Sequence, residues 1–446
     1  MSPSEMSPPP YNSDAEKSVL GAMILSTDSI GDAIEYLEDG YFYETAHQKI
    51  FEAIKTIYSD RKNVDLVVLS DYLKDKNQLD SIGGLSYLAQ IVDAVPTTAN
   101  VRYYIDIVKD KGVRRLLIKN AGMIIRNGYD TGMELGEVVD ESQRLIFAIA
   151  EARQNQQAFL VKGLLREAIG TIEKLSERKE SITGVTTGFI DLDKHTAGLQ
   201  KSELIIIAAR PGMGKSALAM GIAQNACLKS KTPVAVFSLE MSKENLIQRM
   251  LCSQAMVNAN KVRTGFLSHD EWPQLTKAAS ELSDMPMYID DTPAISVLEL
   301  RAKARRLKTT ANIGMIVVDY LQLMRSGTRT ENRQQEISEI SRSLKSLSRE
   351  LDVPVIALSQ LNRALEGREV KKPQLSDLRE SGAIEQDADV VLLISRDDYY
   401  NPTLENRGIA EINIAKQRNG ISGEYVKLKF LREYVKFVNL DMSHGE

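Results

Sequence analysis

The chain has 446 residues, more than one ordinary domain accommodates, so two or three domains with separate cores are expected. Hydrophobic residues make up 43% of the chain and charged residues 26%, and its longest apolar runs fall far short of the roughly 18 residues of a membrane span. The net charge of −5, from 56 basic and 61 acidic side chains, excludes a general attraction to polyanions. Any nucleic acid must therefore be held by local charge.

The first part of the chain predicts a tail followed by a helical domain. Residues 1–11 are rich in proline and serine and lack the basic and apolar regions of a secretory signal, so we expect a disordered tail and a cytoplasmic protein without a membrane partner. Ser13 and Glu16 match the capping-box pattern that begins a helix. From 12 to 152 the apolar residues recur at helical spacing, which predicts an all-helical N-terminal domain.

Residues 153–182 are expected to form a linker that carries one amphipathic helix, over 159–179. Its apolar face has no partner within the segment and includes Leu160, Leu164, Ile169 and Ile172. Such a stripe seeks another surface, either on its own domain or on a neighbouring subunit, and the sequence leaves both alternatives open.

Residues 183–446 alternate short β-branched runs with helical segments, the pattern of a mostly parallel sheet covered by helices on both faces. We expect a second, α/β domain over this range, with antiparallel strands near its end. The parallel strands are predicted at 204–208, 234–239, 315–320, 353–358 and 390–395, and the antiparallel ones near 409–415 and 424–438.

ARPGMGKS, residues 209–216, follows the first predicted strand and precedes an amphipathic helix, as a phosphate-binding loop does. Ala209 stands where the usual pattern has its first glycine, which is compatible with the loop if this position has a negative φ. Lys215 can neutralise the β- and γ-phosphates of ATP, and the Ser216 hydroxyl can bind Mg²⁺. The alternative is a glycine-rich turn without a ligand. The predicted nucleotide contacts are Pro211, Gly212, Met213, Gly214, Lys215, Ser216 and Ala217.

Two other strand tips supply carboxylates to the same edge of the sheet. Asp319 ends the run MIVVDY and is predicted to hold Mg²⁺, whereas Glu240 follows VAVFSL and is predicted to be the catalytic base that activates the attacking water. Arg249, on the next helix, is expected to reach the phosphates. The alternative for Glu240 is an N-cap or first-turn acid of the helix that starts near Lys243.

The fourth strand continues into Gln360, whose amide is predicted to sense the γ-phosphate and to report its loss to the segment 366–389. The glycine, proline and charge content of this segment predicts a mobile loop in which Arg379 and Gly382 bind an anion. The alternative is a solvated surface loop.

Near the end of the chain, Lys416 and Arg418 alternate with Gln417 and are predicted to share one face of a strand. Two cations there suggest an arginine finger that acts on the nucleotide of the next subunit. Solubilising charge at an exposed hairpin is the alternative.

Six stretches in this order and spacing resemble the bacterial replicative DNA helicases of the DnaB family: ARPGMGKS, FSLEMS, VVDYLQLM, SQLNRALE, LRESGAIEQDADVV and KQRNG. AEKSVLGAMI, FYETAHQKIF and GGLSYLAQIVDAVPTTANV are similar to the N-terminal domain of that family. The resemblance implies a RecA-like ATPase core preceded by an all-α domain and a linker helix. It also implies an ATP-driven ring of six subunits that moves 5′ to 3′ on single-stranded DNA, with a primase and a loader as partners.

By the same resemblance, Arg379, Glu380 and Gly382 contact DNA phosphates, Lys416 and Arg418 act on the neighbour's ATP, and the linker helix docks on the adjacent motor domain. Arg325, Arg329 and Arg333 lie in a polar loop that either adds to the positive field or is only solvated. Two other functions share an ATPase core, a RecA-type recombinase and a signalling or assembly ATPase without nucleic acid.

Overall fold

The computed structural model describes residues 8–60, 63–95, 97, 100–153, 182–325, 333–368 and 371–440, together with positions 161, 165, 169, 170 and 173. The chain divides into two compact units, Met1–Leu160 and Val161–Glu446. Most of the predicted linker and of the predicted N-terminal tail lies outside the described residues.

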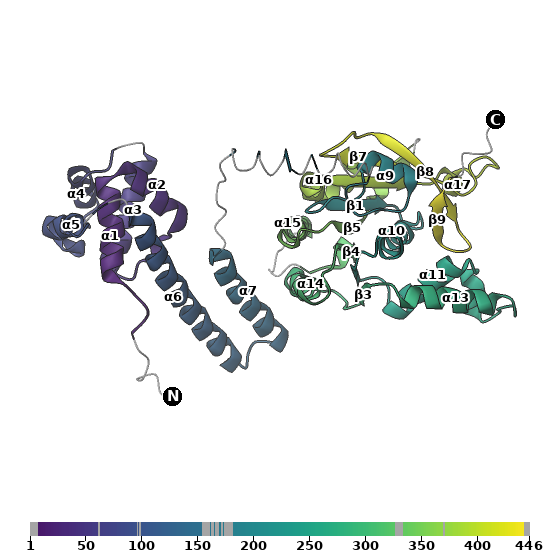
Figure 1. Ribbon diagram of the computed structural model, residues 1–446, viewed down its shortest axis with the longest axis horizontal. Coiled ribbons are helices and arrows are strands. Elements are labelled where there is room, and N and C mark those ends of the chain that lie inside the picture. The colour runs from purple at the N-terminus through teal and green to yellow at the C-terminus, as the bar shows by residue number, and fades with distance from the viewer. Residues whose placement is uncertain are drawn as a thin grey trace. The chain divides into compact units, whose positions relative to one another are not determined.

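The first unit is built from helices around one hydrophobic core (Figure 1). Val19, Leu20 and Met23 of the first helix lie at the centre of this core, next to Ile50 and Ile54 of the third. The helices are α1 (Ser13–Leu25), α2 (Thr27–Tyr36), α3 (Thr45–Ser59), α4 (Leu66–Asp75), α5 (Gly84–Asp93), α6 (Val101–Tyr129) and α7 (Leu135–Arg153), with short 3-10 turns η2 (Asp39–Tyr41) and η3 (Asp80–Ile82).

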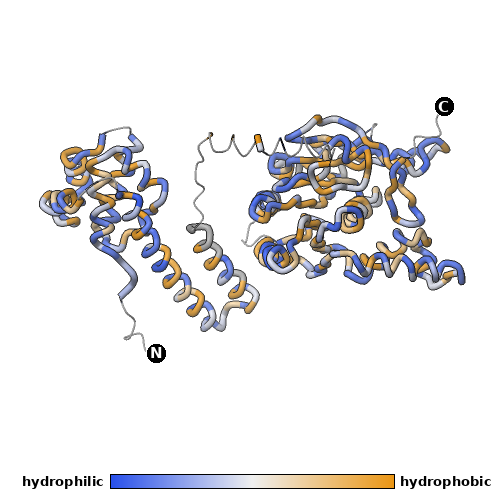
Figure 2. Tube along the Cα trace, in the orientation of Figure 1, coloured by the Kyte–Doolittle hydropathy of each residue, from blue (hydrophilic) through white to orange (hydrophobic). Residues whose placement is uncertain are grey.

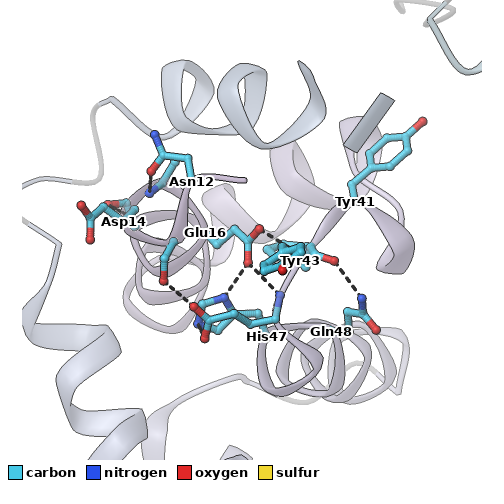
Figure 3. Close-up of polar contacts among 12 residues, drawn as sticks. Asn12, Asp14, Glu16, Tyr41, Tyr43, His47 and Gln48 are labelled. Carbon is cyan, nitrogen blue, oxygen red and sulfur yellow. Dashed lines mark hydrogen bonds and ion pairs between the residues drawn. The ribbon is translucent and has the colours of Figure 1, made fainter. Parts of the chain in front are cut away.

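Helix α1 begins where the sequence predicts, but the capping box is wrong (Figure 3). Asn12 is the N-cap, because its side chain accepts a hydrogen bond from the Ala15 amide at 3.0 Å. Glu16 instead accepts from the Tyr43 amide at 2.8 Å and contacts Nδ1 of buried His47 at 2.7 Å. A long-range partner therefore takes the carboxylate that a capping box would have used locally.

Helices α6 and α7 pack against each other, and the Asn120 side chain of α6 donates to the Leu145 carbonyl of α7 at 2.8 Å. Hydrophobic and hydrophilic residues alternate along both helices (Figure 2), and Ile125 and Tyr129 are exposed. None of the helices in the described part of the chain combines the length and the hydrophobicity that a membrane span requires.

The second unit contains a nine-stranded sheet in the order β3-β2-β4-β5-β1-β6-β7-β8-β9. The pairs from β3 to β6 are parallel, and the last three strands run antiparallel. The strands are β1 (Leu204–Ala209), β2 (Val234–Ser238), β3 (Met287–Asp290), β4 (Met315–Asp319), β5 (Val355–Gln360), β6 (Val390–Ser395), β7 (Ile409–Gln417), β8 (Glu424–Leu431) and β9 (Lys436–Asn439).

Five parallel strands and the antiparallel end of the sheet agree with the prediction, and two details differ. The four-residue edge strand β3 was not predicted, because MYID is short and only partly buried and gives a weak signal. The stretch 424–438 contains two strands, since the chain turns between Leu431 and Lys436.

Helices cover both faces of this sheet (Figure 1), because alternate residues of each central strand point to opposite sides. Ile205 and Ile207 of β1 pack in one core cluster with Leu218 of α10, whereas Ile206 packs in the other with Leu344 of α15. The α-helices are α9 (Ile190–Thr196), α10 (Lys215–Ser230), α11 (Lys243–Ala255), α12 (Ala259–Thr264), α13 (Glu271–Ser283), α14 (Val297–Ala311), α15 (Arg333–Leu351), α16 (Gly382–Asp387) and α17 (Asp397–Tyr400).

Candidate nucleotide site

The loop between β1 and α10 has the backbone conformation of a phosphate-binding loop. Ala209 is the last residue of β1 and pairs with Gln360, so this position does not need the positive φ that a glycine would permit. Gly212 and Gly214 have φ values of 81° and 97°, and α10 begins at Lys215. The alanine at the first position is therefore compatible with a loop that turns its N–H groups toward an anion at the helix N-terminus.

Gly214 is required for a second reason, which is the packing of the C-terminal strands against the loop. A Cβ atom at this position would lie 2.9 Å from Phe437 of β9 and 3.3 Å from Phe430 of β8. The rings of Phe430 and Phe437 are in contact, with centroids 4.7 Å apart. The strands that end the chain thus support the phosphate loop, although more than 200 residues separate Gly214 from Phe437 in the sequence.

Lys215 lies between an acidic and an aromatic group at the carboxyl ends of the parallel strands. Its Nζ atom is 3.9 Å from Oδ1 of Asp319 and 4.2 Å from the centre of the Tyr320 ring. Burial lowers the pKa of Lys215, and the negative charges of Asp319 and Glu240 oppose this change. A buried cation with only a distant carboxylate partner is well suited to receive phosphate oxygens.

Asp319 has a buried oxygen, Oδ1, that lacks a hydrogen-bond partner among the described residues. Burial raises the pKa of this carboxyl group, whereas the charge of Lys215 and a hydrogen bond from Ser216 lower it. An unsatisfied carboxylate oxygen beside a serine hydroxyl is a donor set that suits the hard cation Mg²⁺, so these residues fit the predicted metal.

Glu240 and Arg249 line cavities that adjoin the phosphate loop. Ser216, Ala217 and Arg249 line one cavity, and Glu240 and Arg249 line a second. Glu240 is exposed and does not cap α11, because the Ser242 side chain is the N-cap and accepts from the Asn245 amide at 3.4 Å. The N-cap alternative for Glu240 is therefore wrong, and the carboxylate is free of that role.

Gln360 ends β5 next to the phosphate loop, in register with Ala209. Residue 360 is exposed. Its backbone N–H donates to the side-chain oxygen of Gln322, and its backbone carbonyl accepts from the side-chain nitrogen of Gln322, both at 3.4 Å. Gln322 also donates to the Ser359 hydroxyl at 3.0 Å. Gln360 thus lies at the edge of the sheet that carries Lys215 and Asp319.

The segment 366–389 is more ordered locally than the predicted loop. It contains η7 (Leu375–Ser381) and α16, and it follows η6 (Arg363–Gly367). Buried Leu378 and Ile384 join the core, and Gln374 and Asp377 form a capping box, which explains why short helices form despite the glycine, proline and charge content. Gly382 is exposed and has a helical φ of −52°. The side chains of Arg379 and Glu380 lie outside the described part of the chain.

Lys416 and Arg418 lie near the amino ends of the parallel strands, opposite to the carboxyl ends that carry the phosphate loop. Because β7 runs antiparallel to β6, Lys416 pairs with Val391 near the start of the parallel strands. The Lys416 ammonium donates to the Glu385 carbonyl at 2.6 Å, and the Arg418 guanidinium donates to the Gln386 carbonyl at 2.6 Å. Both cations therefore bond to the C-terminal end of α16 rather than to the phosphate loop of their own chain.

The loop after β4 places Arg325 at the surface, where its backbone forms an isolated parallel β-bridge with Ser296. Arg333, the first residue of α15, pairs with Glu336 and donates to the Gln322 carbonyl. Arg329 lies outside the described residues.

Comparisons with known proteins agree with this arrangement. The family model of the DnaB-like helicase C-terminal domain matches residues 184–439, and that of the DnaB-like helicase N-terminal domain matches 8–110. The chain belongs to the DnaB-like replicative helicase family. It is 50% identical to the replicative DNA helicase DnaB of Geobacillus stearothermophilus over 98% of this chain and 96% of that protein.

Two further relatives of this DnaB-like helicase extend the comparison. The replicative DNA helicase DnaC of Bacillus subtilis is 49% identical over 97% of this chain and 95% of that protein. A solved DnaB-like replicative helicase, described with its interactions with primase, has a TM-score of 0.74 and 33% identity, and covers 96% of this chain and all of its own. The chain is therefore an ATP-dependent replicative DNA helicase, and neither the recombinase nor the signalling ATPase is favoured.

Several residues at the site of this DnaB-like helicase were not predicted. Tyr320, whose ring contacts Lys215, directly follows Asp319. Its position as an aromatic residue after a strand tip was the one local signal for this contact. The contacts of Phe430 and Phe437 with the loop have no local signal, because the strands that carry them are far away in the sequence. The ion pair of Arg210 with Glu366 has no local signal either, because the two residues are 156 positions apart in the sequence.

Proposed function

We propose that this helicase works as a ring of six copies that encircles single-stranded DNA and moves 5′ to 3′. The observation that supports a ring is the position of Lys416 and Arg418, at the edge of the sheet opposite to the phosphate loop. A strand of six residues spans roughly 17 Å, so these cations are too far from the nucleotide of their own chain to complete its site. In a ring, a neighbouring copy can supply them.

Within one copy, the phosphate loop from Pro211 to Ala217 binds the phosphates through its backbone, and Lys215 neutralises the β- and γ-phosphates. Ser216 and Asp319 hold Mg²⁺, which supplies charge neutralisation of the phosphate oxygens when bound. Glu240 accepts the proton of the attacking water, and Arg249 contacts the phosphates. Lys416 and Arg418 of the next copy stabilise the charge that develops in the transition state.

Gln360 senses the γ-phosphate and passes its loss to the segment that contacts DNA. Arg379, Glu380 and Gly382 form that contact, and Arg325 and Arg329 add positive charge around the strand. Six copies of a few cations create a local positive field even though each chain has a net charge of −5. The grip on DNA should therefore weaken with added salt and ignore base sequence. Family membership also supports a cytoplasmic location and partnership with a primase and a loader.

A forked-duplex unwinding assay with ATP tests this function, run beside native mass measurement. We expect the full-length chain to unwind the fork and to have six times the mass of one copy, while a Lys215→Ala variant assembles but does not unwind. Single-stranded DNA should also raise the ATPase rate. An active species with the mass of one copy, or an ATPase rate that DNA leaves unchanged, contradicts the proposal.

A further inference from the structure

Arg210, the second residue of the stretch ARPGMGKS, connects the phosphate loop to the segment that follows β5. Its Nε atom donates to Oε1 of Glu366 at 3.0 Å, and the two side chains form an ion pair. A second nitrogen of the guanidinium donates to the Leu361 carbonyl at 2.8 Å. The Leu361 amide in turn donates to the Ala209 carbonyl at 3.1 Å, so side-chain and backbone bonds join the same two segments.

A second ion pair carries this connection onward to η7. Arg368, two residues after Glu366, donates to Oδ2 of buried Asp377 at 3.1 Å. The Asp377 carbonyl accepts from the Asn362 amide at 3.1 Å, and its carboxylate accepts from the Gln374 amide at 2.8 Å. The residues around η6 are thereby fastened to the start of η7, the element that leads into Arg379, Glu380 and Gly382.

The two ends of the Arg210–Glu366 pair differ in burial. The Arg210 side chain is 7% exposed and that of Glu366 is 52% exposed. A buried guanidinium needs a compensating charge, and the ion pair with Glu366 provides one here. Arg210 immediately precedes Pro211 and Gly212, so the backbone joins its guanidinium, and the carboxylate that it holds, directly to the phosphate loop.

We propose that Glu366 is a positioning residue that passes the nucleotide state from the phosphate loop, through Arg210, to the DNA-contacting segment around η7. This rests on the proposed DNA contacts of Arg379, Glu380 and Gly382. The connection crosses directly between two segments that are 156 residues apart in the sequence. It differs from the route through Gln360 because it passes through side chains, although both routes reach the segment that begins at Leu361.

The test is a Glu366→Gln variant of the full-length helicase, which keeps the size of the side chain and removes its charge. Affinity for fluorescent single-stranded DNA is measured with a non-hydrolysable ATP analogue and with ADP, and the ratio of the two affinities reports the coupling. We expect this ratio to fall about tenfold, the effect of losing one charge-assisted pair. The ATPase rate of this variant without DNA should stay within about twofold of the wild-type rate.

Two matched variants make the result specific. Glu411→Gln removes the Lys372–Glu411 ion pair, which is exposed on the lysine side and half-buried on the glutamate side. Its atoms are 2.8 Å apart, and it joins the same segment to β7 instead of the phosphate loop. It should leave the ratio unchanged. Glu366→Asp keeps the charge and should restore part of the coupling.

The possible outcomes separate this inference from the proposed function. If DNA affinity in the natural chain does not depend on the nucleotide, or if DNA does not stimulate its ATPase, the proposed function fails. If the natural chain is coupled and Glu366→Gln is equally coupled, the role of Glu366 is overturned. A variant that loses ATPase activity and keeps the natural ratio overturns it as well, because Glu366 would then only shape the phosphate loop.

Discussion

The two ends of the parallel strands in the second unit carry different groups. At the carboxyl edge, Lys215, Ser216 and Asp319 lie together within one chain, with Glu240 and Arg249 around the adjoining cavities. At the amino edge, Lys416 and Arg418 donate to backbone carbonyls of α16. The first edge can bind phosphate by itself, whereas the second presents cations without a phosphate site of its own.

Both edges also lead to the same segment. The carboxyl edge reaches it through Arg210 and Glu366, and the amino edge reaches it through the end of α16, a helix that begins at Gly382. In the proposed ring, one copy would therefore hold half of each of two neighbouring sites, with the proposed DNA-contacting segment between them. This arrangement suits a ring, in which heterologous contacts repeat until they close.

The largest expected effect concerns the division of the site between copies. Lys215→Ala and Arg418→Ala, each alone, should lower the ATPase rate about a thousandfold. The first removes the lysine that neutralises the phosphates, and the second removes the proposed arginine finger. An equal mixture of the two should regain activity, since about a quarter of its interfaces combine an intact loop with an intact finger. ATPase measurement on co-assembled rings checks this.

The control is a mixture of the Lys215→Ala chain with a chain that carries both substitutions. No interface in this control mixture contains an intact phosphate loop, so it should stay inactive. If the first mixture stays inactive too, although native mass measurement shows mixed rings, the two residues do not act across an interface.

The second largest effect is on stability at the amino edge. Asp389 accepts from the Leu204 amide at 2.8 Å and pairs with Lys345 at 2.5 Å, and the lysine is largely buried. Asp389→Asn leaves that ammonium without its countercharge and should lower the free energy of unfolding by about 3 kcal/mol. The one tryptophan of the chain, Trp272, lies in α13, so its fluorescence in urea follows the motor unit.

Asp352→Asn is the matched control, because the Lys201–Asp352 pair is exposed on both sides. It should cost only about 0.5 kcal/mol. Equal losses in the two variants would show that burial of the Lys345–Asp389 pair has no special effect.

A smaller effect is expected at Gly214. Gly214→Ala combines a left-handed backbone, which costs about 1–2 kcal/mol for a residue with a side chain, with a contact to Phe437 at 2.9 Å. Binding of a fluorescent ATP analogue should weaken about tenfold. Gly221→Ala, in the middle of α10 and with only an ordinary contact to Phe189 at 3.5 Å, should bind normally. Normal binding by both variants would contradict the packing argument.

The smallest effect is expected for Gln360→Ala, because a second route through Glu366 remains. Unwinding should slow about fivefold more than ATP hydrolysis does, which raises the ATP consumed per base pair. Gln254→Ala, a surface glutamine bonded to Glu281 at 2.6 Å, serves as the control. Unwinding and hydrolysis that both proceed at the natural rate would count against a sensing role for Gln360.

The sequence was most informative where structure depends on neighbours along the chain. The strand before Ala209, the two glycines and the helix after Lys215 were all predicted, because a phosphate loop is made of consecutive backbone groups. The same holds for Asp319 at the tip of β4. Local patterns also misled in two places. Glu16 matches a capping box but contacts Tyr43 and His47 instead, and the segment 366–389 has a loop composition but contains short helices.

By itself, the sequence determined the helical first unit, the α/β second unit and the phosphate loop. It also identified Lys416 and Arg418 as two candidate functional cations. Only the tertiary structure decided that those cations lie across the sheet from the loop, that Phe437 closes on Gly214, and that Arg210 holds Glu366. The physical reason is the range of the forces involved. Backbone conformation follows from adjacent residues, whereas strand order and buried ion pairs depend on segments that meet only when the sheet has formed.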